Sequence, residues 1–249
     1  SFFNGYRQRL FDPSPGFHGI NFLCCCHFTG ADSCSSVLQC TCPELHCPEY
    51  LYSINFQYAM PYITLESHLP GITGLLEYRK DAAQPIRELT QFLLRGPSSL
   101  SEGERELIAS VVSSGNECRF CTTAHTAAAN MLLGENETSA KVLNDITTAP
   151  VSDKMKTLLV IATKVREGGK QVTNEAIDAA KAAGATDIEI HDTVLIAALF
   201  CLYNRYVDGL NTFTPTDTQY YENLADRIVH HGYTRLPEGY DHLKKTISS

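Results

Sequence analysis

The sequence predicts an all-α protein, in which a multi-helix bundle follows an irregular, cysteine-rich segment. Apolar residues recur at intervals of three and four along most of the chain, glycines and prolines interrupt this pattern repeatedly, and no segment shows the alternation of a strand. We therefore divide the chain into an irregular N-terminal extension, residues 1–57, and a helical domain, residues 58–249.

Five helices are expected between residues 66 and 150. Pro70 suits the first position of the first helix, since its missing N–H would have no partner there. Ser101 and Glu104 form a capping box for the third helix. The apolar positions that mark the five are Ile72, Leu75 and Leu76; Ile86, Leu89 and Leu93; Leu107, Ile108, Val111 and Val112; the segment from near Cys118 to Leu133; and Val142, Leu143 and Ile146. Gly96-Pro97, Gly115-Asn116, Gly134 and Pro150 separate them.

Four further helices are expected after residue 150. Ser152 opens one of them, and a short one around Ile177 and Ala180 follows and ends at Gly184. Thr186 and Glu189 form a second capping box, which begins a long helix through Val194, Leu195, Ala198, Cys201 and Leu202. Thr216 with Gln219 opens the last helix, and Gly232 ends it.

Composition excludes several classes of function. The chain has 20 basic and 28 acidic residues among 249, a net charge of −8, whereas a nucleic-acid binder needs a basic surface. Hydrophobic residues make up 43% and charged residues 19%, which is too apolar for a disordered chain. The longest apolar run, Val194 to Tyr203, is about half as long as a membrane span. We expect no nucleic-acid and no membrane partner.

The N-terminal extension holds seven of the ten cysteines: Cys24, Cys25, Cys26, Cys34, Cys40, Cys42 and Cys47. Adjacent cysteines are poor disulfide partners, an odd count leaves one thiol over, and no two-plus-two zinc spacing is present. A metal-binding tail and an extension outside the functional protein both remain open. Asp12, Pro13 and Pro15 interrupt any secretory signal. The chain begins at Ser1, which we interpret as a fragment or a processed form.

The strongest chemical signal is the run Cys118-Arg-Phe-Cys-Thr-Thr-Ala-His125. On an ideal helix Cys118, Cys121 and His125 fall within about 60° of one face. A helix N-terminus lowers a thiol pKa, a nearby histidine relays protons, and two cysteines three apart can form a disulfide. These are the requirements of a thiol peroxidase. A lone C-x-x-C also occurs as half a zinc site or as a buried pair, and a tetrahedral zinc site needs a fourth ligand.

Together with Gly103-Glu-Arg-Glu-Leu-Ile-Ala, this run resembles the alkylhydroperoxidase D and carboxymuconolactone decarboxylase superfamily, and more closely its branch of peroxidase-related proteins. Further similar segments are Leu69–Leu76, Leu94–Ser98, Ala149–Ser152, Ala183–Asp192 and Tyr203–Leu210. The resemblance covers about Tyr58 to Tyr240. It implies an all-helical bundle of the alkylhydroperoxidase D-like type that assembles into homo-oligomers, as trimers or hexamers.

The same resemblance implies roles for four residues. Cys121 would attack the peroxide, Cys118 would resolve the product as a disulfide, and His125 would relay protons. Glu106 would polarise that relay, although from the residues alone it reads equally well as a solvated helix glutamate. Phe120 departs from the family, because alkylhydroperoxidase D enzymes have a second histidine immediately before the attacking cysteine.

We therefore expect an enzyme, a thiol-dependent peroxidase without cofactor. Its substrate would be a small hydroperoxide and its electron donor a dithiol or lipoyl-type group; a reducing cytosol suits this chemistry, so we expect a cytoplasmic location. The alternatives are a redox-sensing or zinc-binding helical protein without turnover, and a carboxymuconolactone decarboxylase-like lyase.

Five other polar or reactive residues have simpler interpretations. Cys201 lies in an apolar run and is expected to be a buried small hydrophobe, and His191 is expected to be a surface or a structural residue. Asn204, Arg205 and Asp208 would line the site or an oligomer interface, or form an ion pair.

Overall fold

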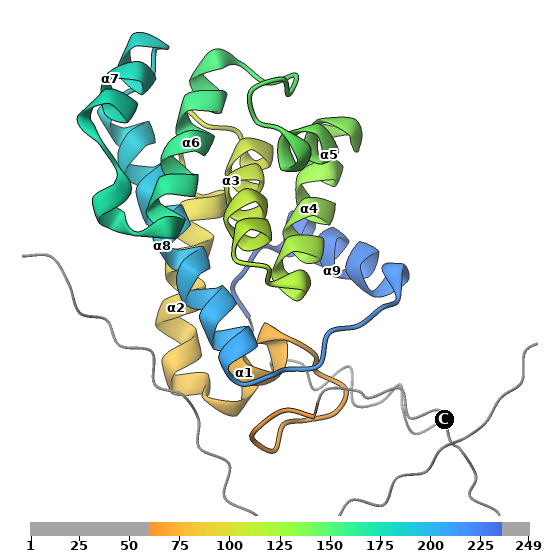
Figure 1. Cartoon of the computed structure of the whole chain (residues 1–249). Coiled ribbons are helices and arrows are strands. Elements are labelled where there is room, and N and C mark those ends of the chain that lie inside the picture. Colours follow the sequence, from red (N-terminus) through yellow and green to blue (C-terminus); the bar gives the residue numbers. More distant parts are fainter. Residues whose placement is uncertain (1–59, 236–249) are drawn as a thin grey trace, which may run out of the picture. The chain divides into compact units, whose positions relative to one another are not determined.

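The structure, a computed structural model, describes residues 60–235. Within this range it contains nine α-helices, one short 3-10 helix and no strand, which confirms the all-α prediction (Figure 1). The helices are α1 (Ile72–Tyr78), α2 (Lys80–Arg95), α3 (Glu102–Gly115), α4 (Arg119–Leu133), α5 (Glu137–Asn144), α6 (Asp153–Glu167), α7 (Asn174–Ala182), α8 (Asp187–Gly209) and α9 (Thr218–His231). The domain boundary at residue 57 and the seven N-terminal cysteines lie outside the described residues.

Helix α3 is the centre of the bundle, and it packs against α4, α6 and α8 (Figure 1). Its residues from Gly103 to Ser113 are all buried except Glu104. The predicted capping box forms at its start: the Glu104 N–H donates to Ser101 Oγ at 3.2 Å, and the Ser101 N–H donates to Glu104 Oε2 at 2.8 Å. A helix covered on nearly every side can hold polar side chains away from water, and α3 does so with Glu106.

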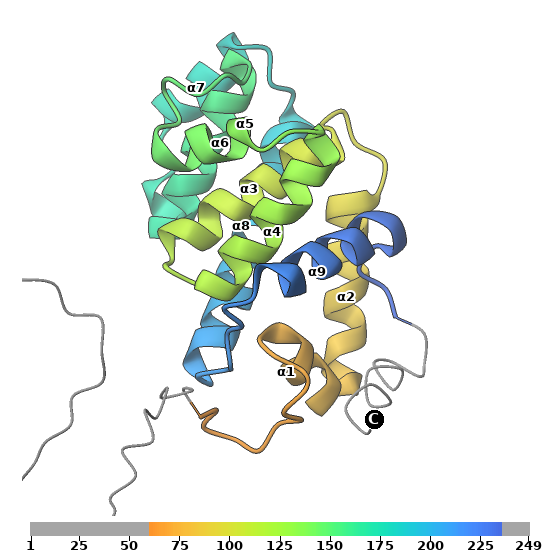
Figure 2. The same cartoon turned by 90° about the vertical axis from the view of Figure 1, so that its right-hand side faces the viewer.

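Helix α4 packs against α3 on one side and α9 on another (Figure 2). It ends at Gly134, whose φ of 72° is the left-handed conformation typical of a helix C-terminus. The thiol motif lies at the opposite end of α4. The bundle thus places the beginning of α4 next to α8 and α9 and keeps it inside the protein.

Two local predictions were wrong. The N-cap of α9 is Asp217 and not Thr216: the Asp217 carboxylate accepts from the Gln219 N–H at 3.0 Å. Cys201 is only partly buried, and its sulfur accepts from Asn116 Nδ2 at 3.6 Å, because α8 turns this position away from the centre of the core. The surface position of His191 is confirmed. No helix among residues 60–235 has the length and apolar character needed to span a membrane.

Candidate active site

The thiol motif lies at the first turns of α4. Cys118 is the N-cap, with an extended backbone, and Cys121 and His125 follow inside the helix. Both thiols are buried, with exposed fractions of 0% for Cys118 and 2% for Cys121. The Cys118 thiol is hydrogen-bonded to the Cys121 thiol, and this hydrogen bond is the main cause of the raised pKa of Cys121. The two sulfurs therefore lie side by side, as the spacing predicted.

The lowered thiol pKa expected at a helix N-terminus meets two opposing effects at Cys121. The hydrogen bond to Cys118, and then burial, raise the pKa of Cys121 well above its ordinary value. Cys121 is therefore a protonated thiol at neutral pH, and any reaction through its thiolate needs a base close by.

Two polar residues of α8 lie beside the dithiol. The amide of Asn204 is hydrogen-bonded to Cys121 and partly offsets the rise of its pKa. Asn204 is itself held by Ser113, whose Oγ accepts from its Nδ2 at 3.0 Å. Burial raises the pKa of Asp208, and a hydrogen bond with the Cys118 thiol opposes this rise. The sequence leaves three roles open for this segment: lining the site, lining an oligomer interface, or forming an ion pair. The structure supports the first role for Asn204 and Asp208, because both lie beside the dithiol. The Arg205 guanidinium instead donates to the Cys201 carbonyl.

His125 is held against Glu106 of α3. The distance from His125 Nδ1 to Glu106 Oε2 is 2.7 Å, and Glu106 is completely buried. An ionised carboxylate can only accept, so Nδ1 donates and Nε2 is the ring nitrogen able to accept a proton. Phe200 packs against the imidazole edge to face, at a centroid distance of 4.5 Å. Glu106 and Phe200 together fix the tautomer and the orientation of His125.

Glu106 has two further partners. Arg95 Nη2 donates to Glu106 Oε1 at 2.6 Å, and the Tyr233 hydroxyl donates to the same oxygen at 2.6 Å. Burial alone would raise the pKa of Glu106, but His125, Arg95 and Tyr233 hold it below its ordinary value. Glu106 is therefore a buried, ionised carboxylate, and the alternative of a solvated helix glutamate is wrong.

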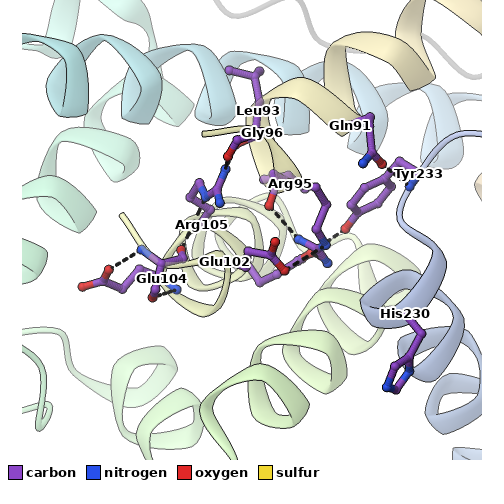
Figure 3. Close-up of polar contacts among 12 residues, drawn as sticks. Gln91, Leu93, Arg95, Gly96, Glu102, Glu104, Arg105, His230 and Tyr233 are labelled. Carbon is purple, nitrogen blue, oxygen red and sulfur yellow. Dashed lines mark hydrogen bonds and ion pairs between the residues drawn. The ribbon is translucent and has the colours of Figure 1, made fainter. Parts of the chain in front are cut away.

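Arg95 and Tyr233 are not among the site residues expected from the sequence. Figure 3 shows Tyr233 pointing from the segment after α9 toward Arg95 at the end of α2. The Arg95 guanidinium lies 5.2 Å from the centre of the Tyr233 ring and also pairs with Glu102 at 3.5 Å. Arg95 stands in one of the segments that resemble the superfamily, which was a usable signal. Tyr233 follows a helix-ending glycine, and no pattern marked it.

A cavity of about 60 Å³ adjoins the motif. Cys121 and His125 line it, whereas Cys118 does not. The other lining residues are mainly apolar or aromatic, together with three arginines and no carboxylate: Ile72, Thr73, Leu76, Arg87, Phe120, Ala124, Tyr203, Leu224, Arg227, Ile228, Tyr233 and Arg235. One cysteine of the pair and the proton-accepting histidine thus face the same small space.

Phe120 forms an apolar wall of this cavity. It is 2% exposed, and its ring packs against Tyr220 and Tyr221 at centroid distances of 6.3 and 5.9 Å. The ring also lies against Gly71, where φ is +57° and a Cβ would collide with it. The resemblance to alkylhydroperoxidase D enzymes leads us to expect a second histidine at this position. In this chain the position is Phe120, whose ring packs against its neighbours and cannot relay a proton.

A family model described as the carboxymuconolactone decarboxylase family matches residues 80–149, a segment that includes Arg95, Glu106 and the motif of α4. The superfamily resemblance is confirmed. No curated protein matches the chain. Among residues 60–235, no group of three or more His, Cys, Asp or Glu side chains is arranged to hold a metal ion.

Two solved structures share the alkylhydroperoxidase D-like fold. An uncharacterized peroxidase-related protein from Silicibacter sp. TM1040 is 24% identical with a TM-score of 0.56, over 61% of this chain and 78% of its own. An uncharacterized peroxidase-related protein from Ralstonia eutropha JMP134, described as an alkylhydroperoxidase AhpD core, is 23% identical with a TM-score of 0.56, over 63% of this chain and 80% of its own. At these identities the likeness shows the fold.

Proposed function

We propose that the chain is a thiol-dependent peroxidase that reduces small hydroperoxides. One observation carries the proposal: the Cys121 thiol and His125 line the same cavity, and Glu106 holds the imidazole with Nε2 as its proton acceptor. Because the pKa of Cys121 is raised, a base at this position is what an attacking thiolate requires. The two structural neighbours are themselves named peroxidase-related proteins, which agrees with this chemistry.

The reaction has two steps on the protein. His125 accepts the proton of the Cys121 thiol, and the thiolate attacks the terminal oxygen of the hydroperoxide. The O–O bond breaks, the alkoxide takes a proton from His125 and leaves as an alcohol, and Cys121 becomes a sulfenic acid. The Cys118 thiol then attacks the Cys121 sulfur, which releases water and closes a disulfide. An external dithiol or lipoyl-type donor reduces this disulfide by exchange.

The surroundings of the two cysteines agree with this order. Cys121 faces the cavity, where a substrate enters, whereas Cys118 is fully buried and does not line it. Asp208 lies beside Cys118, where it can take the proton of the attacking Cys118 thiol and pass it to the hydroxide that leaves Cys121 as water. A cavity of about 60 Å³ fits hydrogen peroxide or the hydroperoxide end of a larger molecule.

A second candidate follows from the matched family model, whose description names a lactone decarboxylase. In a lyase of this kind His125 would act as an acid or base in the cavity, and the dithiol would not be needed. The two candidates therefore predict different effects of replacing Cys121: a peroxidase would lose its activity, whereas the lyase would keep its activity.

The deciding experiment oxidises the reduced protein with hydrogen peroxide or tert-butyl hydroperoxide and locates the products by mass spectrometry. We expect a new disulfide between Cys118 and Cys121. Cys121→Ser should abolish peroxide consumption, and Cys118→Ser should allow one turnover and leave a sulfenic acid on Cys121 that dimedone traps. Cys201→Ser is the matched control, because Cys201 lies outside the cavity, and it should leave consumption unchanged. Unchanged peroxide consumption in Cys121→Ser would refute the proposal, and a lactone decarboxylation retained by that variant would support the lyase.

A further inference from the structure

Beyond the four residues that the superfamily implies, we propose that Tyr233 is a positioning residue that sets the charge balance of the Glu106–His125 pair. The expected change in kcat/KM is the only part of this inference that rests on the proposed function. The geometry behind it is independent of that function, since Tyr233 contacts both members of the pair and lies outside the segment that matches the family model.

Tyr233 contacts Glu106 and His125 at once. Its hydroxyl donates to Glu106 Oε1 at 2.6 Å and lies 3.5 Å from Nδ1 of His125. Its ring lies nearly parallel to the imidazole, with an interplanar angle of 13° and a centroid distance of 6.2 Å. Any change in this side chain therefore reaches the carboxylate and the imidazole together.

Two contacts hold Tyr233 in this place. The Tyr233 N–H donates to Gln91 Oε1 on α2 at 2.7 Å, and Arg95 lies over the ring (Figure 3). The preceding residue, Gly232, has a φ of +66°, and a Cβ there would collide with the Gln91 side chain. The chain after α9 is thus turned back onto α2 in a conformation that favours glycine, and this turn aims Tyr233 at Glu106.

The hydroxyl serves as a permanent donor. Burial, and then the negative charge of Glu106, raise the pKa of Tyr233 well above its ordinary value. Tyr233 consequently stays protonated throughout the range in which an enzyme of this kind works, and it always donates to the carboxylate. The charge of Glu106 is shared among three donors: Arg95, Tyr233 and His125.

Removal of the Tyr233 hydroxyl should affect the Glu106–His125 pair in one direction. With the Tyr233 hydroxyl removed, the Glu106 carboxylate is less stabilised and attracts the Nδ1 proton of His125 more strongly, so the imidazolium form is favoured. Fewer molecules then hold the neutral imidazole that must accept the Cys121 proton. The other charged or titratable groups that face the pair or its partners remain in place: Glu102, Arg105, Tyr203, Arg87, Arg227 and Arg235.

Tyr233→Phe tests the inference, since it keeps the ring and removes only the hydroxyl. The acid limb of the kcat/KM profile should move to higher pH by about one unit, the effect of one hydrogen bond to a charged group. The titration of the His125 ring, followed by NMR of the reduced protein without substrate, should move in the same direction by a similar amount.

Tyr221→Phe is the matched control. The Tyr221 hydroxyl is also buried and belongs to α9, but it donates to the Pro215 carbonyl at 3.0 Å and does not line the cavity. Tyr221→Phe should change neither the pH dependence of kcat/KM nor the NMR titration of the His125 ring. If Tyr233→Phe leaves the His125 titration unchanged, the inference is wrong. If no variant turns over peroxide, the peroxidase proposal fails, and the NMR titration still decides the role of Tyr233.

Discussion

The direction of the Glu106 side chain decides that this glutamate, unlike its neighbours on α3, belongs to the candidate site. Glu102 and Glu104 lie on the same helix and are partly exposed, whereas Glu106 faces the core and meets Arg95, His125 and Tyr233. A buried charge without partners is strongly unfavourable, so these contacts make an ionised carboxylate possible inside the protein. The ionised carboxylate in turn fixes the tautomer of His125.

Glu106→Gln should therefore destabilise the protein in a pH-dependent way. At pH 7 we expect a loss of about 3 kcal/mol, because the buried Arg95 guanidinium loses its closest carboxylate. The pKa of Glu106 is lowered in the folded state, so its stabilisation is complete above its unfolded pKa and is lost as pH falls through its folded pKa. The difference from the unmodified protein should shrink below about pH 4. Urea unfolding at pH 7 and at pH 3.5 measures this.

The control for this prediction is Glu88→Gln, because Glu88 is exposed on α2. It should change the free energy of unfolding by less than about 0.5 kcal/mol at either pH. An equal loss for Glu106→Gln at both pH values would show that the ionised carboxylate is not what stabilises the site.

At the scale of elements, the beginning of α4 brings the thiols together. Glu117 has a φ of +60°, and the Cys118 N–H donates back to the Ser113 carbonyl at 3.1 Å, which makes a tight turn between α3 and α4. Cys118 thereby becomes the N-cap, and Cys121 lies three residues further on, in the first turn of the helix. The helix start that sequence analysis placed near Cys118 is confirmed, but the protonated state of Cys121 depends on what surrounds that start.

The beginning of α9 allows a direct test of a capping residue. Asp217→Ala should cost about 1 kcal/mol of stability, because the Gln219 N–H loses its carboxylate acceptor. Thr216→Ala, the neighbouring exposed residue, should cost less than about 0.5 kcal/mol. Denaturant unfolding of the two variants at pH 7 measures the difference, and a larger loss for Thr216→Ala would restore the cap expected from the sequence pattern.

At the scale of the whole molecule, the candidate site is assembled from five parts of the bundle. Arg95 comes from α2, Glu106 from α3, the thiol motif from α4, Asn204 from α8 and Tyr233 from the segment after α9. Disturbance of any one of these packing contacts would change the charges around His125. The site is thus a property of the folded bundle and is more than a local motif.

The superfamily resemblance also leads us to expect that the chain assembles with copies of itself. Light scattering on the purified protein should give a mass about three or six times 27.5 kDa. The measurement should be repeated after dilution, because a specific oligomer keeps its mass while a weak association does not. A mass of one chain at all concentrations would contradict this expectation.

The sequence by itself determined the class of the fold, most helix ends, and the clustering of Cys118, Cys121 and His125, because these features depend on interactions between residues a few positions apart. Only the tertiary structure decided that Glu106 is buried, that Cys121 is protonated, and that Arg95 and Tyr233 belong to the site. Burial and charge are sums over segments distant in the chain: 127 positions separate Glu106 from Tyr233, and no local pattern encodes their contact.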